Sequence, residues 1–226
     1  MSVFGRVLVH VGTGLLLASV ILRGAQSGAY SEIRPVDEAS QQADFFTLRA
    51  HLQAAIARHD SAAVLSVVNV NIRNTFGGDN GRDSFERLWR LESPDTELWE
   101  KLGSALALGG TFEANGTFVA PYTFSRWPEK FDAFDHIAII GSRVRVHAAP
   151  LLDSGTLGVL SFAVVPIPRE ARPPTADQAR QWIAVRLLDG RIGYVASQYV
   201  RSPIDYRAIF ARVGHEWQLV TFVAGD

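Results

Sequence analysis

The chain has 226 residues, with 22 lysines and arginines against 23 aspartates and glutamates, and it contains no cysteine. Without cysteine it can form no disulfide scaffold, no thiolate zinc site and no thiol nucleophile. A formal net charge of -1 gives no basic excess to neutralise a phosphate backbone, so we expect no nucleic-acid partner. The length allows one large domain or two small ones, and the change of composition along the chain favours two modules.

The first residues have the pattern of a secretory signal. Arg6 precedes an apolar stretch from Val7 to Leu22, and small residues follow as far as Ala29. A basic start, an apolar run and a small-residue end predict cleavage after Ala29 and export to the periplasm or out of the cell. We expect residues 1–29 to be a signal peptide, with no membrane span in the mature chain. A retained anchor is the alternative, although the run is near the lower limit of the roughly 17 to 25 residues that cross a bilayer.

The next part of the chain has helical patterning. Residues 30–43 are polar and lack a period, which predicts a linker. Apolar residues then recur at helical spacing over Asp44–His59, and a further helix is expected over Arg82–Trp89. Ser93–Gly109 has a proline near its start and glycine at its end, which is typical of a helix with both termini defined. We therefore predict a mainly helical or mixed module over residues 44–134.

After Thr111 the pattern changes, and from residue 135 to 201 it alternates with a period of two. The segments with this alternation are Ile137–Ile140, Val144–His147, Leu157–Val165, Trp182–Leu187 and Ile192–Val195. Turn residues separate them, and Asp189–Gly190 has the composition of a tight hairpin turn in which glycine supplies the positive φ. Such a series predicts a small barrel or sandwich.

Five short stretches in this region carry a resemblance to a known family. They are Gly141–Pro150, Gly158–Leu160, Gln181–Val185, Asp189–Val195 and Ser197–Val200. In this order they resemble the bacterial SH3 (SH3b) domain, and the whole chain is similar to exported proteins of uncharacterised function that contain one. The resemblance implies a small SH3-like β-barrel over residues 135–201. The chain departs from the family pattern at His147, where arginine is usual, and in the long insertion Pro166–Arg180.

Two more alternating segments follow that unit. Tyr206–Arg212 and Glu216–Val223 flank a short turn and predict a hairpin. Two strands alone are barely stable in water, so we expect residues 202–226 to return to the first module. The predicted fold class is therefore α+β, with a mainly helical N-terminal module completed by a C-terminal β-hairpin and an SH3-like small β-barrel between them.

The sequence shows no familiar catalytic signature. It has no nucleophile elbow, no His-Glu-x-x-His helix, no Walker loop and no dinucleotide fingerprint. The loop Gly77–Asp83 lacks the acid spacing of a calcium loop, and we interpret Asp132, Asp135 and His136 as turn residues. We therefore expect no catalytic residue, no metal site and no cofactor.

A ligand groove on the expected barrel would combine amphipathic rings with a few directional polar groups. The candidates are Arg145, Trp182, Asp189, Tyr194 and Tyr199, with core packing as the alternative for the rings. The resemblance implies a non-catalytic binding or scaffold protein that recognises a peptidoglycan peptide or an envelope protein.

Two other functions stay open. An envelope enzyme would hold an acid/base site between the two modules, using Asp79, Asp83 or Asp205, and would show two close, buried carboxylates. A purely structural partner in a larger complex would show an exposed apolar patch.

Overall fold

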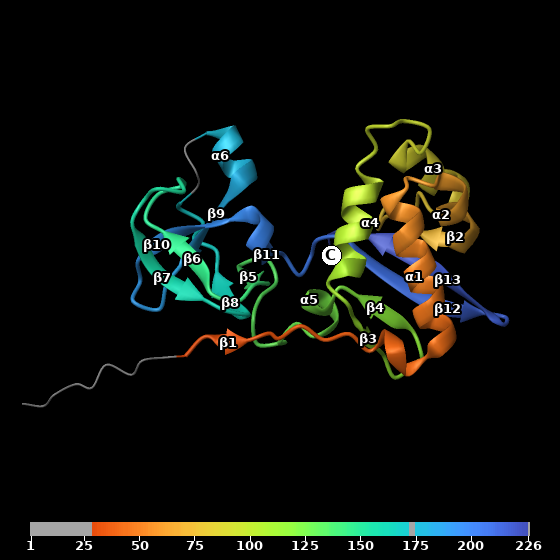
Figure 1. Ribbon diagram of the computed structural model, residues 1–226, viewed down its shortest axis with the longest axis horizontal. Coiled ribbons are helices and arrows are strands. Elements are labelled where there is room, and N and C mark those ends of the chain that lie inside the picture. Colours follow the sequence, from red (N-terminus) through yellow and green to blue (C-terminus); the bar gives the residue numbers. More distant parts are fainter. Residues whose placement is uncertain (1–28, 172–174, 226) are drawn as a thin grey trace, which may run out of the picture.

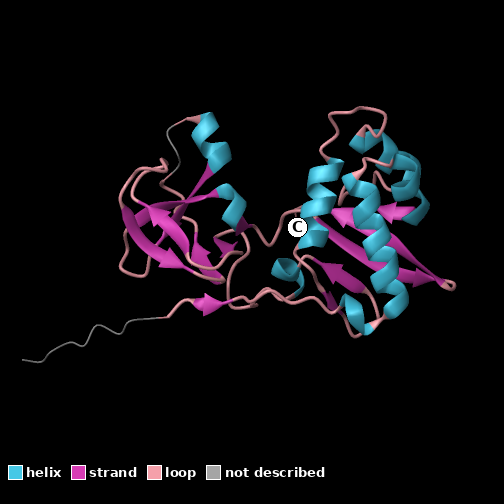
Figure 2. Cartoon of the chain, viewed as in Figure 1, coloured by secondary structure: helices cyan, strands magenta, loops and turns pink. Residues whose placement is uncertain are grey.

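The computed structural model describes residues 29–171 and 175–225, so the predicted signal peptide lies outside these residues apart from Ala29 (Figure 1). Within the described ranges, six α-helices, two 3-10 helices and thirteen strands are present, and the strands form three sheets. Figure 2 shows strands throughout both lobes of the molecule. The protein is therefore a mixed α/β fold with a large β content. The predicted α+β class, with a mainly helical N-terminal module and a closed barrel, is wrong.

The first lobe comprises residues 39–125 and 207–223. Its helices are η1 (Ala39–Gln41), α1 (Ala43–Ala57), α2 (Ser61–Val67), α3 (Arg82–Trp89), α4 (Leu98–Ala107) and α5 (Tyr122–Ser125). Its strands are β2 (Val68–Arg73), β3 (Thr111–Phe112), β4 (Phe118–Ala120), β12 (Arg207–Val213) and β13 (Glu216–Val223). They form one five-stranded sheet in the order β2-β13-β12-β4-β3. This sheet is why the lobe is not mainly helical.

The terminal hairpin lies in the middle of that sheet. β12 pairs antiparallel with β4, and β13 pairs parallel with β2. Phe45 of α1 packs on the sheet, with ring centroids 4.5 Å from Phe118, 5.4 Å from Phe210 and 4.9 Å from Trp217. The hairpin therefore supplies both backbone partners and core side chains to residues far earlier in the chain.

Side chains accept hydrogen bonds from backbone amides at the starts of two first-lobe helices, α2 and α4. Asp60 accepts a hydrogen bond from the Ala63 amide at 3.0 Å and starts α2. α4 begins later than its sequence predicts, because Thr96 Oγ1, and not Ser93, accepts from the Leu98 amide at 3.2 Å.

The second lobe comprises residues 31–32 and 136–201. Its strands are β1 (Ser31–Glu32), β5 (His136–Ile139), β6 (Val144–His147), β7 (Thr156–Leu160), β8 (Ala163–Pro166), β9 (Trp182–Arg186), β10 (Ile192–Ala196) and β11 (Val200–Arg201). Its helices are α6 (Ala176–Gln181) and η2 (Ser197–Tyr199). The strands form two sheets of four, in the orders β1-β8-β5-β11 and β7-β6-β10-β9, around a shared apolar core.

These two sheets do not close into the expected barrel. Only Ser161 and Phe162 separate β7 from β8, and Phe162 has a positive φ of 46°. The chain turns sharply there, so that β8 pairs with β5 and β1 instead of extending the sheet of β7. By contrast, the predicted turn at Asp189–Gly190 is confirmed, because Gly190 has a φ of 85° and β9 pairs antiparallel with β10.

Residues 30–43, expected as a linker, are packed against both lobes. Ser31 and Glu32 pair with β8, and Ile33 is buried. Further along, Asp37 accepts two hydrogen bonds of 2.7 Å from the buried Arg49 guanidinium. Polar side chains of this segment include salt-bridge partners such as Asp37. Hydrophobic periodicity does not distinguish such residues from residues that only contact water.

Arg201 joins the two lobes at the end of β11. Its guanidinium donates to Ser104 Oγ of α4 at 3.1 Å and to the Tyr206 carbonyl at 2.8 Å, and it lies 3.2 Å from Asp205. Burial lowers the pKa of this guanidinium, while the charge of Asp205 acts in the opposite direction. The chain therefore leaves the second lobe at a point that Arg201 holds against α4 of the first lobe.

Ending the chain after Asp205 should unfold the first lobe, because its sheet would lose both central strands. Amides of α1 and α4 should then exchange hydrogen at the rate of an unfolded chain. As a control, two glycines inserted after Gly214 lengthen only the β12–β13 turn and should leave that protection intact. Full protection of α1 in the shortened protein would show that the hairpin is dispensable.

Gly190→Ala should lower the free energy of unfolding by roughly 1–2 kcal/mol, because an L side chain is strained at positive φ. A Cβ at this glycine meets nothing within 4 Å, so the conformational cost is isolated from packing. Gly155→Ala is the matched control, since its Cβ also meets nothing within 4 Å and its φ is not positive. Thermal unfolding should separate the two variants by about 2–8 °C, and equal midpoints would show that positive φ imposes no strain on alanine here.

Candidate functional site

Three of the sequence-predicted ligand residues lie around one part of the second lobe. Arg145 is exposed on β6, Tyr199 in η2 is 43% exposed, and Trp182 at the start of β9 is 5% exposed. Arg145 and Tyr199 line one hollow of about 450 Å³, and Trp182 lines an adjoining hollow of about 460 Å³. Because the two hollows share Leu152, Ala196 and Gln198, we treat them as one and call it the second-lobe groove.

The groove has two chemically different halves. One half, which we call the cationic half, is lined by Ser142, Arg143, Val144, Arg145, His147 and Tyr199 together with the shared residues. The other, the apolar half, is lined by Pro150, Leu151, Gln178, Gln181, Trp182 and Ser197 with the same shared residues. Among the described lining residues none is an aspartate or glutamate. The groove therefore combines fixed positive charge at one end with apolar and amide groups at the other.

A tight turn before β6 positions the cationic half. Gly141 allows the Tyr199 ring close to the backbone, because a Cβ there would lie 3.4 Å from Tyr199 Cδ1 and 2.8 Å from Val144 Cγ2. Arg143 has a positive φ of 55°, and its amide donates to Ser161 Oγ at 2.8 Å. This turn places two arginines, separated by one residue, on the same rim of the groove.

His147 lies at the floor of the cationic half. It is 7% exposed, and its ring meets Trp182 edge to face at 5.1 Å. Its Nδ1 atom is buried and has no hydrogen-bond partner among the described residues. The atom is not accessible from the groove, so His147 contributes to the site by packing its ring against Trp182.

The other two predicted ligand residues do not line the groove. Tyr194 is half-buried on β10, directly opposite His147 in the ladder, so it supports the floor. Asp189 lies in the turn at the far end of the β9–β10 hairpin from Trp182. Hydrogen bonds from Arg191 hold the Asp189 carboxyl and lower its pKa. Asp189 is therefore a turn residue in a local ion pair.

Sequence reasoning missed three residues that line the groove. Arg143, Gln198 and Leu152 line the groove, and the side chain of Leu152 is 81% exposed. His147 was visible as a departure from the family pattern, but its buried and unpartnered nitrogen depends on tertiary packing. Arg143 could have been identified from the sequence, because it directly precedes the strand that begins at Val144 and follows the turn residues Gly141 and Ser142.

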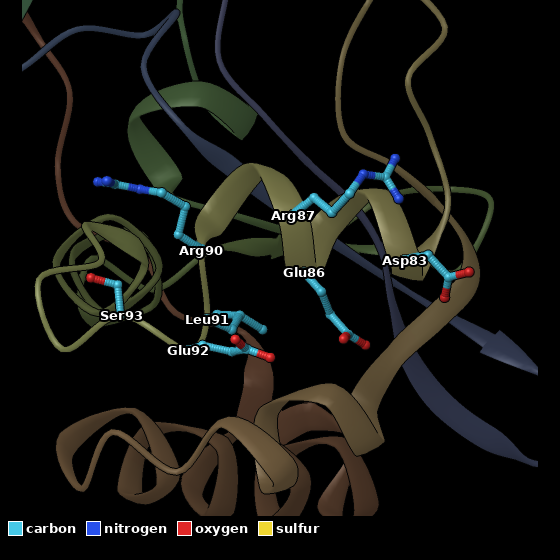
Figure 3. Close-up of a pocket in the computed structure, with 7 residues that line it drawn as sticks. All are labelled: Asp83, Glu86, Arg87, Arg90, Leu91, Glu92 and Ser93. Carbon is cyan, nitrogen blue, oxygen red and sulfur yellow. The ribbon is translucent and has the colours of Figure 1, made fainter.

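Another hollow is on the first lobe, beside α3, and has a volume of about 690 Å³. In Figure 3 the Glu86 and Glu92 side chains point into the space below α3, while Arg87 and Arg90 extend away from it. Both glutamates are exposed. Water solvates such carboxylates, so they lack the desolvation that would adapt a pair for acid/base work at neutral pH.

The three aspartates considered for an enzyme site have different surroundings. Asp79 accepts a hydrogen bond from Ser84 Oγ and lies 3.5 Å from Arg87. Asp205 pairs with Arg201, and Asp83 lines the hollow of Figure 3. In the part of the chain that the structure describes, no group of three or more histidine, aspartate or glutamate residues is arranged to hold a metal ion.

A smaller hollow of about 340 Å³ lies where the segment before α1 crosses α4 and α5. Tyr122 lines it and is fully buried, with no partner for its hydroxyl among the described residues. Burial raises the pKa of Tyr122 to about 12. The phenol is therefore protonated at neutral pH, and it packs with Ile33, Ala138 and Val164 at the junction of the lobes.

Known proteins add no further assignment. Over residues 29–171 and 175–225, no helix has the length and apolar character required to span a membrane. Comparison with models of protein families, with curated proteins and with solved structures found no match to this chain.

Proposed function

We propose that this chain is a non-catalytic binding module of the cell envelope that recognises a cell-wall peptide or a protein partner through the second-lobe groove. The observation that carries the proposal is the joining of Arg145, Tyr199 and Trp182 around one groove. Aromatic and arginine side chains are enriched in binding interfaces, because they combine large contact areas with directional hydrogen bonds.

The lining of the groove fits a peptide. Gln181 and Gln198 offer both amide donors and carbonyl acceptors, which match the backbone groups of an extended chain. Leu151 and Leu152 are exposed beside them and offer apolar contacts for side chains. Concave sites of this kind, mainly apolar with a few placed polar groups, are typical of ligand binding.

The apolar head of the sequence supports a location outside the cytoplasm. The basic start at Arg6, the run Val7–Leu22 and the small residues up to Ala29 match a secretory signal. A periplasmic or secreted module would meet peptidoglycan and envelope proteins, which is consistent with the proposed ligand.

The test is co-sedimentation of the purified protein with peptidoglycan. Arg145→Ala and Tyr199→Ala should each reduce retention by about tenfold, the effect of losing about 1.4 kcal/mol of binding free energy. Arg126→Ala is the matched control, since Arg126 is an exposed arginine directly after α5 and outside the groove, and it should bind like the unchanged protein.

Equal retention of all four proteins would reject the groove as the binding site. Thermal unfolding of each variant serves as the folding control. A variant that binds less while unfolding at the unchanged temperature assigns the loss to the groove and not to instability.

A further inference from the structure

We infer that the cationic half of the groove binds a free carboxylate of an extended peptide, while the apolar half takes the residues beside that carboxylate. This inference rests on the proposed function and specifies the ligand group that the same groove recognises. The observations that carry it are two arginines without partners among the described residues and a lining without acids.

The two arginines differ from most others in the molecule. Within the described ranges, neither the Arg143 nor the Arg145 guanidinium has a hydrogen-bond or ion-pair partner. In the same lobe, Arg169 lies 2.5 Å from Asp135 and Arg191 lies 2.7 Å from Asp189. The fold thus pairs other arginines of this lobe with carboxylates of the chain and leaves these two facing the groove.

The chemistry of the arginine side chain selects the ligand group. A guanidinium presents its N–H groups as a planar fork that matches the two oxygens of a carboxylate. Two such groups beside one hollow attract an anion. No aspartate or glutamate among the described lining residues opposes this attraction.

His147 closes the floor of this end of the groove. The residue is 7% exposed, lines the cationic half, and keeps Nδ1 unpartnered among the described residues. Buried polar groups in folded proteins are nearly always paired. Because less than 1 Å² of Nδ1 is accessible, a ligand in the groove cannot reach that atom, and His147 contributes to the floor by packing against Trp182.

The apolar half distinguishes a peptide from a small anion. Leu152 is 81% exposed and contributes to both halves, so a ligand that crosses from one to the other covers it. The Gln181 and Gln198 amides line the same path. An inorganic anion would occupy the cationic half alone and leave this surface uncovered.

The experiment measures binding of defined peptides to the full chain by NMR titration or calorimetry. The probe is an acetylated pentapeptide of alanine and leucine with a free C-terminal carboxylate. Its C-terminally amidated form removes the charge, and an amidated form with one internal glutamate restores it on a side chain. The free-acid peptide should bind at least about tenfold tighter than the amide, equivalent to 1.4 kcal/mol.

The third peptide distinguishes the two sources of a carboxylate. Tight binding of the glutamate peptide supports recognition of an acidic side chain, and tight binding of the free acid alone supports recognition of a chain terminus. Inorganic phosphate is the small-anion probe. If phosphate binds as tightly as the free-acid peptide, the groove is a general anion site and the inference fails.

Variants identify the residues responsible. Arg143→Gln and Arg145→Gln should each reduce the preference for acid over amide, and the double variant should abolish it. Arg126→Gln, which removes the same charge from an exposed position directly after α5, should leave the preference unchanged. A preference that persists in the double variant would overturn the inference.

The two levels of the proposal can fail separately. If acid and amide peptides bind equally tightly and Tyr199→Ala weakens both, the groove is a peptide site and only the carboxylate assignment is lost. If none of the three peptides binds and Tyr199→Ala leaves peptidoglycan retention unchanged, the proposed function is lost as well.

Discussion

The pairing of β12 and β13 between β2 and β4 is the constraint on which the rest of the structure depends. It makes the first lobe discontinuous in sequence, so that the second lobe is an insertion with both of its ends held. Arg201 fixes one end against Ser104 and the Tyr206 carbonyl. Pairing of Ser31 and Glu32 with β8 holds the second lobe to the segment that leads into α1. The second lobe, which carries the groove, is thus attached to the rest of the chain at both ends.

Local chemistry in the sequence was a good guide wherever neighbouring residues decide the structure. The Asp189–Gly190 turn needs a positive φ, which glycine supplies without strain. The Ser93–Gly109 segment contains α4, although Thr96 sets its start. Long-range pairing was not predictable in this way. β2 is a strand because β13 lies beside it, and the reversal at Phe162 that prevents barrel closure has no signature in hydrophobic period.

The candidate site was predictable to the same extent. Arg145, Trp182 and Tyr199 were identifiable as polar or aromatic residues near strand ends, and the fold brings them to one groove. Asp189 was misplaced because the two ends of a hairpin are close in sequence but far apart along the strands. The unpartnered nitrogen of His147 is a property of packing, which no single-chain pattern reveals.

The discontinuous first lobe also sets an order of events during synthesis. β12 and β13 follow the second lobe in the chain, so β4 and β2 emerge from the ribosome long before their partners. All ladder partners within the second lobe are already present when Arg201 has been made. Its assembly can therefore precede that of the first lobe, whose strand edges stay open in the meantime. Unpaired edges of this kind promote aggregation, so the newly made chain is exposed to this risk until β13 is in place.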